Sequence, residues 1–155
     1  MDYENDVITF IELANKNEVR MLLVGGGAVN FHGYQRHSAD VDFWFELSDD
    51  NLDKLLRTLR EMDFELNQIP EDVVKGEQNI SIKFSPLQTL ELISRFNPNK
   101  TFTQSWNDAE ISTIKGHKVV RYRVLSFDDL ITSKIKSGRP KDLLDIQELK
   151  RIRSL

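Results

Sequence analysis

Two aspartates separated by one residue are the most chemically suggestive feature of the sequence. Asp40, Asp42 and Glu46 alternate with apolar residues across residues 40–47. This alternation predicts a β-strand with both aspartates on one face, about 7 Å apart at their Cα atoms. Two carboxylates so placed suit a divalent cation, and oxygen-only ligands favour Mg²⁺ or Mn²⁺ over Zn²⁺. Taken alone, the pair also fits an exposed, acidic strand end.

A run of glycines supplies a second candidate site. The apolar run 21–24 leads into Gly25, Gly26 and Gly27, which predicts a buried strand ending in a turn. Glycines at a strand-to-helix turn let backbone N–H groups approach a phosphate. A dinucleotide-binding GxGxxG motif would need glycine where Asn30 stands, and no Gly-Lys-Ser/Thr follows as in a P-loop. We therefore predict phosphate contacts from the backbone of Gly25 and Gly26.

The glycines and aspartates together form one longer motif. It reads apolar-Gly-Gly, thirteen further residues, then Asp-apolar-Asp-apolar, here Val24-Gly25-Gly26 and Asp40-Val41-Asp42-Phe43. This motif resembles the signature of nucleotidyltransferases of the DNA polymerase β superfamily. The segments 25–36 and 134–145 also resemble small prokaryotic nucleotidyltransferases related to the AbiEii toxins. The resemblance spans roughly residues 20–150, and it departs from the commonest motif at Gly26, where many members have Ser.

The resemblance implies a third carboxylate on a neighbouring strand. Glu46 lies too far along the strand that carries Asp40. Glu91 is embedded in the apolar strand pattern 89–93, where an unpaired carboxylate would be costly to bury. We predict Glu91 as the third catalytic and metal-binding acid; the alternative is an edge-strand glutamate that points to solvent.

Two predicted C-terminal helices carry charged residues on their apolar faces. Lys134 shares the apolar stripe of the helix that begins at Ser126, and Asp142 shares a face with Ile146 and Leu149. Either Lys134 reaches a triphosphate with Asp142 orienting it, or the two residues form an ion pair that pins the helices together.

Two arginines are further candidates for phosphate binding. A planar guanidinium suits phosphate oxygens, so Arg36 and Arg139 could contact a nucleotide, or each could be an ordinary surface arginine.

The remaining patterns predict the fold. Apolar periodicity, turn residues and caps predict helices near 5–15, 28–31, 49–59, 101–107, 126–136 and 140–153, and strands near 21–24, 40–47, 80–84, 90–93, 111–114 and 119–124. Residues 67–78 are predicted to be a loop. We expect one domain over residues 1–155 in the α+β or mixed α/β class, with helices flanking a mixed sheet. The resemblance implies the polymerase β-type nucleotidyltransferase fold.

Composition narrows the class of protein. The 155 residues carry a net charge of −4, with 17 acidic and 7 basic residues in 1–80 and 8 and 14 in 81–155. This asymmetry fits an acidic wall facing a basic wall across a cleft, or chance patterning. There is no cysteine and no apolar run of membrane-spanning length, and the N-terminal stretch Met1–Asp6 is acidic where a signal peptide would be basic. We expect a cytoplasmic protein with no membrane partner.

The resemblance implies a magnesium-dependent enzyme that moves an NMP from an NTP to an acceptor hydroxyl. Asp40, Asp42 and Glu91 would hold two Mg²⁺ ions, with Mn²⁺ as an alternative. The acceptor could be RNA, such as a tRNA 3′ end, a protein or a small molecule, and the chain could belong to a toxin–antitoxin pair. The rivals are a catalytically inactive nucleotide-binding or toxin–antitoxin partner of the same fold, and a metal-dependent nuclease, which would not need the glycine turn.

Overall fold

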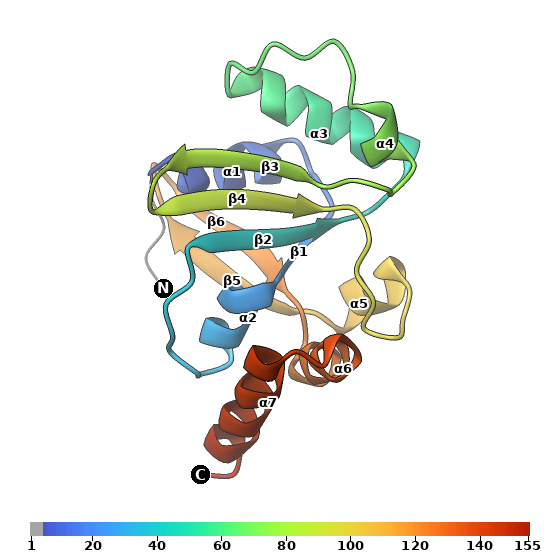
Figure 1. The fold of residues 1–155 in the computed structure, drawn as a ribbon. Coiled ribbons are helices and arrows are strands. Elements are labelled where there is room, and N and C mark those ends of the chain that lie inside the picture. Colours follow the sequence, from blue (N-terminus) through green and yellow to red (C-terminus); the bar gives the residue numbers. More distant parts are fainter. Residues whose placement is uncertain (1–4) are drawn as a thin grey trace.

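A six-stranded mixed sheet forms the centre of the molecule. The computed structural model describes residues 5–155, and its strands lie in the order β3-β4-β2-β1-β6-β5 (Figure 1). The strands are β1 (Met21–Val24), β2 (Asp40–Phe45), β3 (Ile80–Ser85), β4 (Gln88–Ile93), β5 (Glu110–Lys115) and β6 (Val119–Val124). β2 pairs in parallel with β4, as β1 does with β6, and the other neighbours are antiparallel. The predicted mixed sheet is confirmed.

Helices cover both faces of the sheet. They are α1 (Asn5–Lys16), α2 (Gly25–Phe31), α3 (Asp49–Glu61), α4 (Glu71–Val74), α5 (Phe102–Asp108), α6 (Phe127–Ser137) and α7 (Pro140–Arg153). Figure 1 shows α1 and α3 on one side of the sheet and α2, α6 and α7 on the other. The sheet therefore has two differently covered faces, and β2 contributes to both.

Alternation along β2 separates apolar side chains from acidic ones. Val41, Phe43 and Phe45 are buried on the α1 side, where the ring of Phe43 lies 6.2 Å from that of Phe10. The opposite side carries the aspartates and Trp44, whose ring packs between Phe96 and Phe102. The α1 side is the main hydrophobic core, because burying aromatic and aliphatic side chains there removes a large apolar area from water.

The structure corrects three local predictions. α2 begins at Gly25 itself, so the glycines form the first helical turn and not a separate turn before a helix. The predicted loop 67–78 contains the one-turn helix α4, which buries Val73. β2 ends at Phe45, two residues early, because the chain turns into α3, whose first turn is capped by the Ser48 hydroxyl accepting from the Asn51 N–H.

Within residues 5–155, every helix falls short of the length and hydrophobicity that crossing a bilayer requires.

Candidate active site

β2 and β4 bring the three predicted carboxylates together. In the parallel register, Asp42 lies opposite Glu91, and Asp40 lies opposite Thr89. Residues paired in this way point to the same face and are about 5 Å apart at the strand spacing. Asp42 and Glu91 are partly buried, whereas Asp40 is exposed. Glu91 is thus beside the aspartates, on the neighbouring strand where the third acid is expected, while Glu46 pairs with Arg20 instead.

The three carboxylates perturb one another. The pKa of Asp42 is raised to about 6, first by burial and then by the negative charges of Asp40 and Glu91, against the lowering effect of Lys141 and Lys134. Neighbouring like charges are relieved when a cation binds between them. An all-carboxylate donor set of this kind fits Mg²⁺ or Mn²⁺.

The carboxylates do not form a closed metal cage as they stand. Across residues 5–155, no three acidic, imidazole or thiol side chains converge on a common point. The donor set nevertheless fits a divalent cation in its chemistry and its strand positions.

The glycine turn lies directly against this cluster. Gly25 has a φ of +60°, in the left-handed region that favours glycine, and a Cβ added to it would overlap Asp42 Oδ2. A Cβ on Gly26 would lie 2.6 Å from Ser38 Oγ. Ser38 therefore fills the space into which a serine at position 26 would project, and its hydroxyl lies beside the turn. Ser38 was not predicted from the sequence, although its position two residues before Asp40 could have indicated that it lies near the site.

Lys134 is buried between two aspartates. Its Nζ lies 2.8 Å from Asp145 Oδ2 and 3.3 Å from Asp142 Oδ1, and all three side chains are almost fully buried. Burial alone would raise the pKa of Asp142, but hydrogen bonds from Arg139 and the charge of Lys134 outweigh it and lower that pKa. The ion pair between Lys134 and Asp142 is present, as the second of the two predicted interpretations states.

Both predicted arginines belong to the same network. Arg36 donates from Nε and Nη2 to the two carboxylate oxygens of Asp145, at 2.8 and 3.0 Å. Arg139 donates to Asp142 at 2.7 and 3.1 Å. Arg36 is half-buried, whereas Arg139 lies exposed on the surface and pairs with a residue of its own helix start. The network joins the loop before β2 to α6 and α7. Its base Arg36 comes from the acidic half of the sequence and its acids from the basic half, so the predicted separation into two charged walls does not hold here.

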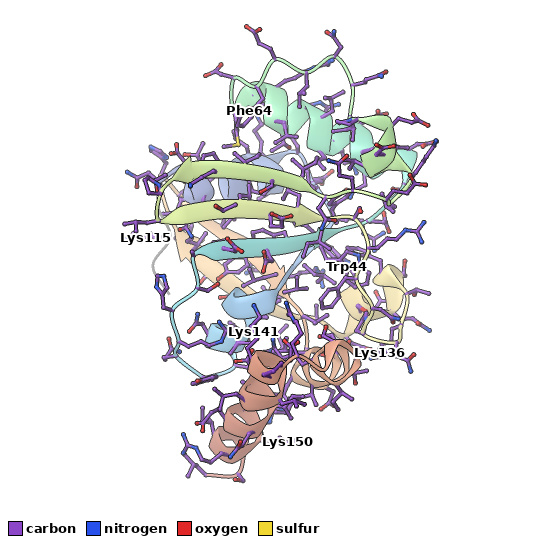
Figure 2. All side chains as sticks on the ribbon, viewed as in Figure 1. Trp44, Phe64, Lys115, Lys136, Lys141 and Lys150 are labelled. Atoms are coloured by element: carbon purple, nitrogen blue, oxygen red, sulfur yellow. The ribbon has the colours of Figure 1, made fainter. Side chains whose placement is uncertain are left out.

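Sequence reasoning also missed two residues on α7. Asp145 lies one turn after Asp142 on the inward face, a spacing of three residues that could have identified it. Lys141 is exposed, yet the positive charge of Lys141 lowers the pKa of Asp42 more than the positive charge of Lys134 does. Figure 2 shows Lys141 at the end of α7 that is nearer the sheet. Among the ion pairs of the described residues Lys141 has no carboxylate partner, so its ammonium is available to a ligand.

Two comparisons with known proteins agree with this geometry. Residues 5–155 match the family DUF6036, described as nucleotidyltransferases of unknown function, and the chain belongs to this family. The fold is similar to a crystal structure of the lincosamide antibiotic adenylyltransferase LnuA with lincomycin bound. That similarity has a TM-score of 0.57 and 19% sequence identity over 96% of each chain. No curated protein matches the chain.

The fold and family define the class of protein. The chain has the polymerase β-type nucleotidyltransferase fold, in the mixed α/β class. It is a nucleotidyltransferase, an enzyme that transfers a nucleoside monophosphate.

Proposed function

We propose that this chain transfers an NMP from an NTP to an acceptor hydroxyl at the carboxylates of β2 and β4. The observation that carries this proposal is the register that sets Glu91 beside Asp42, directly against the Gly25 turn. Asp40, Asp42 and Glu91 would hold divalent cations, two Mg²⁺ ions by the resemblance, or Mn²⁺. When bound, such ions neutralise phosphate charge and make an acceptor hydroxyl more acidic.

The other site residues would bind and orient the triphosphate. The backbone N–H groups of Gly25 and Gly26 lie at the start of α2, where no side chain caps them, and would donate to phosphate oxygens. Arg36, Lys134 and Arg139 would add positive charge. Because Asp142 and Asp145 engage all three, these residues also fix the position of α7, and Lys141 is the ammonium with freedom to reach the phosphates.

The acceptor is RNA, protein or a small molecule by the resemblance. One observation favours testing small molecules first: the fold matches an antibiotic-bound adenylyltransferase along 96% of each chain. A relation to AbiEii toxins and a role in a toxin–antitoxin pair remain predictions from the sequence.

Label transfer tests the proposal. The protein is incubated with Mg²⁺, each α-labelled NTP and, separately, small hydroxyl compounds, pooled RNA or a protein extract. Asp42→Asn should abolish labelling. Asp53→Asn is the matched control, because Asp53 is exposed on α3 away from the site, and it should label normally. The labelled fraction identifies the acceptor class.

Other outcomes favour the rival functions. Nucleotide binding without transfer to any acceptor would support a catalytically inactive partner protein. RNA shortened without NTP would support a nuclease. Labelling that persists in Asp42→Asn would overturn the site.

A further inference from the structure

A separate hollow opens at the other end of β1. β1 and β6 are parallel and pair only at Leu22–Arg123 and Leu23–Val124, so their amino-terminal ends are not joined in the sheet. Around these ends lies a hollow of about 570 Å³ that α1, α3 and α5 help to line. Asn15 of α1 donates a hydrogen bond to the Arg121 carbonyl across it, at 3.0 Å.

The hollow is rich in positive charge. Arg20, Lys54, Arg121 and Arg123 line it, against one carboxylate, Glu18. Arg20 and Lys54 are compensated by Glu46 and Asp50 outside the lining. Arg121 and Arg123 take part in none of the ion pairs of residues 5–155. Because they are two residues apart on β6, both point to one face of the sheet, about 7 Å apart at their Cα atoms.

One aromatic ring holds two of these guanidinium groups in place. Arg123 Cζ lies 4.1 Å and Arg20 Cζ 4.9 Å from the ring centroid of Trp106. Arg123 also donates to the Trp106 carbonyl, at 3.3 Å. Cation–π contacts of this kind fix a guanidinium without neutralising its charge. The guanidinium groups of Arg20 and Arg123 are therefore preorganised, and the exposed Arg121 adds a third one beside them.

Apart from Asn15 and the half-buried Tyr122, the rest of the lining is apolar. Ile11, Val19 and Met21 are buried within it, and Ile111 is exposed at its edge. A site of a few hundred Å³ that combines an apolar wall with a few convergent cations suits a ligand with a planar ring and an anionic group. Guanidinium groups bind phosphate oxygens in two-point fashion, and bases stack on apolar or guanidinium surfaces.

We propose that this hollow is a second ligand site that binds a nucleotide unit, with Arg121 and Arg123 on its phosphate and the apolar wall against its base. The nucleotide unit is either a free mononucleotide or one residue of an RNA strand. The site is distinct from the transfer site, because Met21 pairs with Phe45 whereas Val24 pairs with Asp42. Those three steps along β1 separate the two by about 10 Å.

Tryptophan fluorescence can report on this hollow alone. The chain has two tryptophans, so a Trp44→Phe background leaves Trp106 as the only reporter. Titrations use AMP, CMP, GMP, UMP, inorganic phosphate and a short single-stranded RNA, each in EDTA so that the carboxylate site has no metal. We expect a saturable change with nucleotides, and competition by phosphate at higher concentration.

Two variants and one control make the assignment specific. Arg121→Gln should weaken nucleotide binding about tenfold, since a hydrogen bond to a charged group contributes about that much. Arg123→Gln should weaken it at least as much. Lys118→Gln, an exposed cation in the turn of the same hairpin, should leave affinity unchanged.

Comparing the titrations with RNA and with mononucleotides shows whether the bound nucleotide unit belongs to an RNA strand or is free. RNA that binds at least a hundredfold more tightly than its mononucleotides identifies an RNA strand, and equal affinities identify a free nucleotide. The proposal is overturned by the absence of a saturable signal at millimolar ligand. It is equally overturned if both arginine variants bind with undiminished affinity. Neither result bears on the transfer site, which is tested with metal present.

Discussion

The two faces of the sheet are held by different forces. On the α1 side, Phe43 is fully buried and packs against Phe10 of α1. On the other side, α7 is attached largely through charged groups, since Asp142, Asp145 and Leu149 are its buried residues. The ion pairs of the polar face can exchange their internal partners for a charged ligand, whereas the close packing of the apolar core leaves no such partners to exchange. The comparison indicates that the α1 side depends on apolar packing, whereas the attachment of α7 on the other side depends largely on buried ion pairs.

The largest effect on folding is expected on the apolar face. Phe43→Ala should lower the free energy of unfolding by about 3–5 kcal/mol, because it removes a fully buried ring and leaves a cavity. Urea denaturation measures this change. A loss below about 1 kcal/mol would mean that the α1 side is not the main source of stability.

A slightly smaller effect is expected from the buried lysine on the polar face. Lys134→Met should cost about 3 kcal/mol, because Asp142 and Asp145 would lose a shared buried counter-charge while keeping their arginines. The matched control is Lys136→Met, an exposed lysine on the same helix (Figure 2). Equal unfolding midpoints for the two variants in urea would contradict this account of α7.

Asp42→Asn should separate stability from activity. Transfer should fall at least about 1000-fold, the scale of losing one electrostatic group at a reacting centre. The folded protein should gain about 1–2 kcal/mol near pH 7, since a partly buried carboxylate with a raised pKa no longer repels its neighbours. Thermal melts in EDTA, beside Asp53→Asn, measure the gain; a lower melting temperature would refute the proposed repulsion.

The gain expected from Asp42→Asn should also depend on pH. The pKa of Asp42 is about 6 in the folded protein against 3.8 in the reference state. The folded state therefore binds more protons between these values, and the contribution of Asp42 to stability falls as pH rises from about 4 to about 6. Carboxylates with lowered pKa values act in the opposite direction. The difference between wild type and Asp42→Asn, measured by urea denaturation without metal, isolates the group, and parallel pH curves would exclude the shift.

Much of the fold was predictable because local patterns agree with the tertiary structure. Period-two alternation identified β2 and β3, and Ser126 was recognised as the cap that accepts from the Asp129 N–H. α4 was not predicted because a single helical turn has no periodicity to detect. The glycines of α2 were assigned to a turn because glycine is a poor helix former, whereas here the close approach to Asp42 requires it.

Candidate site residues were predictable where a pattern within one short segment of the sequence indicates their role. The spacing of Asp40 and Asp42 identifies them as a carboxylate pair, and the charge of Glu91 within an apolar strand identifies it as a third candidate. The ion-pair network was only partly predictable, since Arg36 and Asp145 come from distant segments and no local pattern joins them. In the sequence, nothing distinguishes Lys141 from other exposed lysines; only the three-dimensional structure shows that its charge acts on Asp42.

The contact between Arg36 and Asp145 joins residues 109 positions apart. Closing so long a loop is entropically costly, and such contacts tend to form after local ones in folding. The pairing of Leu22 with Arg123 closes a loop of similar length. α7 would therefore dock only after β6 has joined the sheet, late on the folding pathway. Substitutions in the network should accordingly speed unfolding more than they slow folding. The helix that holds Lys134 and Arg36 in place would thus be among the last parts to assemble and the first to loosen.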